Sequence, residues 1–70
     1  MKRRVLLKKI AAEAARQGVQ WELMRQGGRH EVYSLGGKMI PVERHTELDN
    51  MYAELVYREC AEKLGKGWWR

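Results

Sequence analysis

Two pairs of adjacent glycines, at positions 27–28 and 36–37, divide the middle of the chain into three short stretches, and this spacing constrains the fold most. In the first two stretches polar and apolar residues alternate, which is the period of a half-buried strand, and the third stretch follows the second pair of glycines. The three stretches are VQWELMR, HEVYSL and KMIPV. Because paired glycines supply tight turns, we expect an antiparallel meander. Pro41 argues that the third strand lies at an edge of the sheet, or that the proline lies at the end of its strand.

The segments on either side of the meander follow helical spacing instead. Apolar residues recur at that spacing over Arg3–Gln17, and Gly18 is placed to end the helix. Across residues 47–64 two apolar stripes compete for the core. We assign the core to the first stripe, because centring on the second would bury Glu59 without a partner. The first stripe is Tyr52, Ala53, Val56, Tyr57, Cys60 and Leu64, and the second is Leu48, Met51 and Leu55.

The order helix, three strands, helix predicts an α+β domain with both helices on one face of a three-stranded antiparallel sheet. Double-stranded-RNA-binding domains use the same order. At 70 residues the chain is expected to form a single domain, residues 1–70, with residues 65–70 as a flexible tail. Trp68 and Trp69 in this tail could stack on bases, anchor a partner or fold back on the thin core, and we favour the last role.

Composition narrows the classes of function. Fourteen Lys and Arg against nine Asp and Glu give a formal net charge of +5, which favours a polyanionic partner. No apolar run approaches the roughly 20 residues that span a bilayer, so we expect a soluble, cytoplasmic protein without membrane contact. The single cysteine, Cys60, can form no disulfide within the chain and is not grouped with other ligand types, so no metal site is expected.

Both histidines lie in the middle of the chain, and each follows an arginine. Gly28, Arg29 and His30, between the first and second strands, resemble the glycine, small polar residue, histidine motif of HicA-family toxins. These are the RNA-cleaving partners in bacterial HicA and HicB toxin–antitoxin pairs. Pro41 and His45 match a further family element, and WELMRQ and ELDNMYAELVYREC match a strand and the last helix, so that the resemblance covers about residues 2–60. Arg29 stands where members usually carry serine or asparagine.

The resemblance implies a toxin that cleaves mRNA without a metal or other cofactor and is held inactive by a HicB-type antitoxin protein. It places His30 at the family's catalytic position, as general acid or base. An imidazole suits that chemistry because its unperturbed pKa of about 6.5 leaves both forms available near neutrality. His45 is either the second acid–base group or a hydrogen-bonding group at the start of the following helix. The alternative function is a non-catalytic double-stranded-RNA-binding module, in which the histidines contact only sugar or phosphate.

Cations are also needed to neutralise charge on the phosphate. Arg29 and Arg25 are the candidates closest in sequence to His30. The basic start of the chain either follows the RNA backbone or forms a solvated face; its residues are Lys2, Arg3, Arg4, Lys8 and Lys9. The second stripe is left partly exposed once the core is assigned, so Leu48, Met51 and Leu55 are the candidate contact with the antitoxin.

Overall fold

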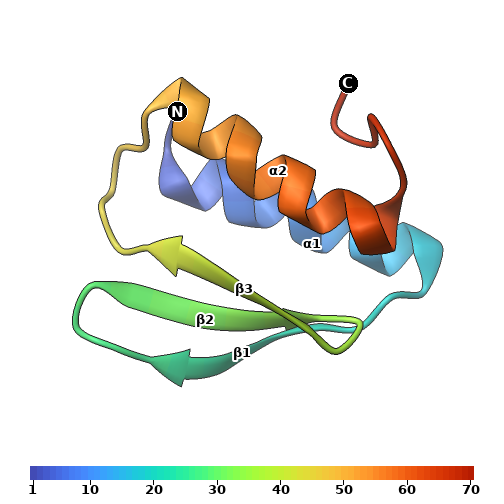
Figure 1. The fold of residues 1–70 in the computed structure, drawn as a ribbon, viewed down its shortest axis with the longest axis horizontal. Coiled ribbons are helices and arrows are strands. Elements are labelled where there is room, and N and C mark those ends of the chain that lie inside the picture. The colour runs from blue at the N-terminus through green and yellow to red at the C-terminus, as the bar shows by residue number, and fades with distance from the viewer.

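The computed structural model describes residues 1–70 and contains five elements in the predicted order (Figure 1). The three strands form one antiparallel sheet in the order β1-β2-β3, so β3, which contains Pro41, is an edge strand, the first of the two alternatives for Pro41. Both helices lie on the same face of the sheet (Figure 1), which confirms the α+β prediction. The elements are α1 (Arg3–Gln17), β1 (Trp21–Gln26), β2 (His30–Leu35), β3 (Lys38–Glu43) and α2 (Asn50–Leu64).

The core lies between the sheet and the helices. The first stripe of α2 is confirmed as its core face, since all of its members are buried except Tyr52, which packs against the others. Twelve apolar residues form the cluster, and none of them is more than 4% exposed. They are Leu6, Ile10, Ala14, Leu35, Ile40, Val42, Leu48, Ala53, Val56, Tyr57, Cys60 and Leu64.

Leu48 corrects the prediction for the second stripe. Its side chain is 3% exposed and belongs to the core, whereas Met51 and Leu55 are 77% and 58% exposed. Helix α2 begins at Asn50, where the Asp49 carboxylate accepts a hydrogen bond from the Met51 N–H. Leu48 therefore precedes the helix and does not share the helical phase of the other two residues. Of the second stripe, only Met51 and Leu55 are exposed, and these two residues form the exposed strip of α2.

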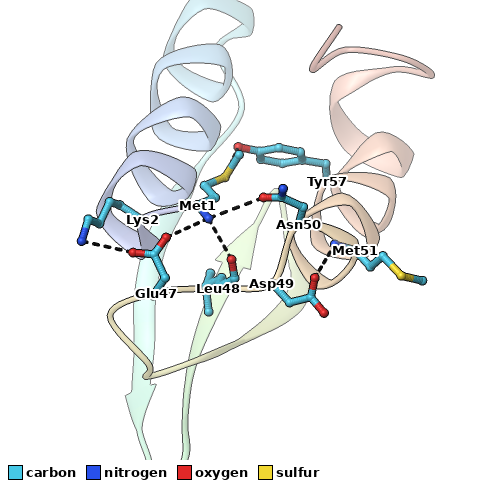
Figure 2. Close-up of polar contacts among 8 residues, drawn as sticks. All are labelled: Met1, Lys2, Glu47, Leu48, Asp49, Asn50, Met51 and Tyr57. Atoms are coloured by element: carbon cyan, nitrogen blue, oxygen red, sulfur yellow. Dashed lines mark hydrogen bonds and ion pairs between the residues drawn. The ribbon is translucent and has the colours of Figure 1, made fainter.

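The segment before α2 pairs with the start of the chain. Lys2 and Glu47 are antiparallel bridge partners, and the Leu48 N–H donates to the Met1 carbonyl oxygen at 2.7 Å. The Met1 ammonium donates to the Leu48 carbonyl oxygen at 2.9 Å and lies 2.9 Å from the Glu47 carboxylate. Figure 2 shows both contacts. This pairing attaches the connection between β3 and α2 to the beginning of α1.

The two C-terminal tryptophans fold back onto α2, as expected. Trp68 Nε1 donates to the Tyr57 carbonyl oxygen at 2.8 Å. The Tyr57 ring meets Trp68 edge to face at 5.1 Å between centroids, and the Trp69 centroid lies 6.1 Å from it. Both tryptophans thus extend the core beyond the end of the helix. The flexibility of residues 65–70 stays a prediction.

The strand register decides which side chains share a face. His30 lies opposite Glu43, and Val32 lies opposite Pro41. Leu35 is buried under the helices, so by strand alternation His30 and Val32 lie on the open face of the sheet. The β2–β3 turn that fixes this register is formed by Gly36 and Gly37, with φ values of 57° and 91° that favour glycine.

Candidate functional site

A pocket of about 490 Å³ lies at one end of the sheet, where the β1–β2 turn meets the connection from β3 to α2. Its volume falls within the range of about 300 to 1,000 Å³ that is usual for ligand sites. No hydrophobic residue lines it. The pocket brings both histidines together, each with the arginine that precedes it; the lining residues are Gly28, Arg29, His30, Glu43, Arg44 and His45.

Backbone contacts hold the two sides of this pocket together. His30 begins β2 and pairs with Glu43, the last residue of β3. Beyond that pair, the Arg44 N–H donates to the Arg29 carbonyl oxygen at 3.1 Å. The Arg44 guanidinium Nη1 donates to the Gly27 carbonyl oxygen at 2.9 Å. The ladder therefore continues past the last strand residue and fixes the β1–β2 turn beside the segment that carries His45.

The pocket has the groups that acid–base chemistry on a phosphodiester requires. His30 and His45 are both exposed to solvent, so a substrate can reach either imidazole. Arg29 and Arg44 are exposed as well, and two guanidinium groups outweigh the single carboxylate of Glu43. Such a pocket favours an anionic ligand, and its side chains are of the types that accept a proton, donate a proton and neutralise a phosphate.

The other predicted phosphate-binding cations lie outside the pocket. Arg25 pairs with Val32 and therefore shares the open sheet face with His30. Lys2 contacts the Glu47 carboxylate at 3.1 Å, and the Lys9 ammonium lies 5.7 Å from the centroid of the Tyr57 ring. Arg4 and Lys8 are exposed on α1, in the helical layer of the molecule.

The environment of Arg3 differs from the prediction, which placed this residue among the phosphate-binding cations. Its side chain is 17% exposed and its guanidinium forms an ion pair with Glu31, so its charge is already paired inside the fold. The Arg3 Nε also donates to the Glu43 carbonyl oxygen at 2.6 Å. A guanidinium held in this way is not free to bind phosphate, and Arg3 is removed from the set of candidate RNA contacts.

Sequence reasoning missed Glu43 and Arg44. A signal for both was present, because residues pair at equal distances on either side of the two-residue turn between Leu35 and Lys38. Counting outward from that turn places residue 43 opposite His30 and residue 44 just beyond it. The repeated arginine–histidine sequence at positions 44–45 gave a second indication.

Two further classes of chemistry find no support in the side chains. Burial raises the pKa of the Cys60 thiol to about 12, so this residue is a packed apolar side chain and not a nucleophile. No group of three or more His, Cys, Asp or Glu side chains is placed to hold a metal ion.

Neither helix is long and apolar enough to cross a membrane.

Comparison with known proteins adds no relative. No protein-family model, curated protein or solved structure matches the chain. The chemistry of the pocket is therefore inferred from its own residues.

Proposed function

We propose that the protein is the toxin of a type II toxin–antitoxin system, a metal-independent RNA endonuclease that uses His30 and His45 as its acid–base pair. The observation that carries this proposal is the pocket that joins the two histidines with Arg29 and Arg44. The likeness of Gly28, Arg29 and His30 to the HicA motif supports the same function, since His30 holds the catalytic position of that motif.

The proposed reaction is a transesterification. One imidazole, in its neutral form, removes the proton from a ribose 2′-OH, and the 2′ oxygen attacks the adjacent phosphorus. The bond from phosphorus to the 5′ oxygen breaks, and the other imidazole, in its protonated form, donates its proton to that leaving oxygen. Arg29 and Arg44 neutralise the charge that develops on the phosphoryl oxygens. The products are a 2′,3′-cyclic phosphate and a 5′-hydroxyl.

A toxin of this kind acts on mRNA in the cytoplasm and requires a partner that keeps it inactive. We place the contact with a HicB-type antitoxin on the exposed strip of α2, Met51 and Leu55, because large apolar side chains that a monomer leaves in water commonly mark an interaction surface. The positive net charge of the chain is complementary to an acidic partner.

A second candidate function is supported by the order of the elements. Helix, three strands, helix is also the order of double-stranded-RNA-binding domains, which recognise RNA without cleaving it. In that function the histidines and arginines of the pocket would contact sugar or phosphate only.

Analysis of the reaction products distinguishes the two. The purified protein is incubated with mRNA, and the new ends are examined. Ends that carry a 2′,3′-cyclic phosphate, absent with a variant in which both His30 and His45 are alanine, support the endonuclease. RNA that stays intact but is retarded in a gel supports the binding module. The double variant controls for contaminating nucleases.

A further inference from the structure

The first half of the connection from β3 to α2 is attached at two points to one residue, Arg3. The Arg3 Nε donates to the carbonyl oxygen of Glu43 at 2.6 Å. The Arg3 backbone N–H donates to the carbonyl oxygen of Thr46 at 2.9 Å. Between these two acceptors lie Arg44 and His45, both of which line the pocket. Arg3 thus brackets the part of the pocket that is contributed by this connection.

A largely buried acid holds the Arg3 side chain in turn. The guanidinium pairs with Glu31, whose side chain is 11% exposed and whose Oε1 also accepts a hydrogen bond from the Tyr33 hydroxyl at 3.0 Å. Glu31 follows His30 in β2, and its side chain points to the opposite, helical face. The Arg3 hydrogen bond, with a second from Tyr33, holds the pKa of Glu31 below its ordinary value, so the carboxylate stays charged at neutral pH.

The shape of the side chain matters here. A guanidinium presents its donors in a rigid planar fork, so Arg3 can bond the Glu43 carbonyl through Nε and the Glu31 carboxylate through Nη2 at the same time. A lysine ammonium is a point donor at the end of a flexible stem and cannot span both acceptors in this geometry. Replacement of Arg3 by lysine therefore keeps the charge and the backbone bond to Thr46 but loses the simultaneous side-chain bonds to Glu43 and Glu31.

We propose that Arg3 is a positioning residue, which holds the connection from β3 to α2 so that His45 lies in the pocket with His30. The catalytic consequence rests on the proposed endonuclease function, whereas the placement of His45 can be measured without it. Figure 2 shows the adjoining pairs of Met1 and Lys2 with Glu47 and Leu48, which continue the same attachment toward α2.

The test compares Arg3→Lys with Arg16→Lys, a matched change at an exposed arginine of the same helix that also pairs with a glutamate, Glu13. The imidazole NMR signals of His30 and His45 are recorded for each variant beside thermal melting and the kinetics of RNA cleavage. We expect Arg3→Lys to shift the His45 signals, to leave those of His30 in place and to lower kcat at least about tenfold with little change in KM, because small misplacements of a catalytic group are costly. Arg16→Lys should change none of these.

A second variant, Glu31→Gln, removes the charged partner of Arg3 with little change of size and should shift the His45 signals in the same way. If Arg3→Lys does not fold, the His45 signals of Glu31→Gln test the proposal in its place. Parent-like His45 signals in a folded variant would overturn the proposal, and so would shifts of equal size at both histidines. If the parent protein cleaves no RNA, the proposed function fails, but the His45 signals still decide the role of Arg3.

Discussion

The ion pair of Arg3 with Glu31 couples the stability of the fold to pH. Hydrogen bonds from Arg3 and from Tyr33 lower the pKa of Glu31 below its ordinary value of 4.5. A carboxyl whose folded-state pKa is depressed contributes its full stabilisation above the unfolded-state pKa and loses it as the pH falls through the folded-state value. The contribution is therefore present at neutral pH and disappears in acid.

We accordingly expect the melting temperature of the parent to fall as the pH drops below about 4.5, the ordinary pKa of glutamate. Glu31→Gln should melt lower than the parent at pH 7 and show a shallower fall in acid. Part of the fall should remain, because the pKa values of Glu13 and Glu47 are lowered as well, to about 2 for Glu13. Thermal melting between pH 3 and pH 7 provides the measurement. Glu22→Gln, at an exposed site, is the control, and an unchanged acid slope in Glu31→Gln would count against this role of the ion pair.

Single residues also show where sequence reasoning succeeds and where it stops. The position of His30 at the start of β2 could be predicted because a glycine turn and the start of a strand are local signals. Glu31, the partner of Arg3, could not be predicted, because 28 positions separate the two residues and only the packing of α1 against the sheet brings them together. Arg3 was for that reason assigned to the RNA-binding surface, although its side chain is largely buried.

At the level of elements, periodicity predicted α1 and the first two strands closely, and the second glycine turn placed the third strand. The start of α2 was not predicted correctly. The apolar pattern runs through Leu48 without a break, although the chain before Asn50 pairs with the N-terminal residues and is not helical. A pairing between segments so far apart in the chain leaves no periodic signal. The predicted exposed strip therefore wrongly included Leu48.

Met51 and Leu55 should matter for binding and not for folding. The double variant Met51→Ser, Leu55→Ser should bind the antitoxin more weakly, because it removes the exposed apolar strip of α2. Its melting should stay cooperative, since surface changes usually alter stability by about 0.5 kcal/mol or less. The proposed HicB-type antitoxin serves as the binding partner in this assay, and Glu59→Ser, at another exposed position of α2, is the control. Parent-like affinity would exclude the strip from the interface.

Leu48 should behave in the opposite way. Because its side chain is 3% exposed and packed in the core, Leu48→Ala should destabilise the fold by about 2 to 5 kcal/mol. Chemical denaturation of the variant beside the parent measures the change. A loss below about 0.5 kcal/mol, the size of a surface effect, would return Leu48 to the exposed strip.

For the molecule as a whole, both helices cover one face of the sheet (Figure 1). The histidine pocket lies at one end of the sheet, where the β1–β2 turn meets the connection from β3 to α2. In the proposed mechanism the side chains that line the pocket supply the acid, the base and the cations. Cleavage should then proceed at an unchanged rate in EDTA, as expected for a site with no cluster of metal ligands. Loss of activity in EDTA, with recovery on addition of magnesium, would contradict this mechanism.

The most direct test of the central claim is His30→Ala, with melting temperature, RNA affinity and cleavage rate measured on one preparation. We expect cleavage to fall by about 10² to 10⁴, the usual contribution of one positioned acid–base group. His30 is exposed at the edge of the pocket, so stability should change by about 0.5 kcal/mol or less. RNA affinity rests on the cations and should keep its dependence on salt. Cleavage at near the parent rate would exclude His30 from the chemistry, and a much lower melting temperature would make His30 a structural residue and favour the RNA-binding module.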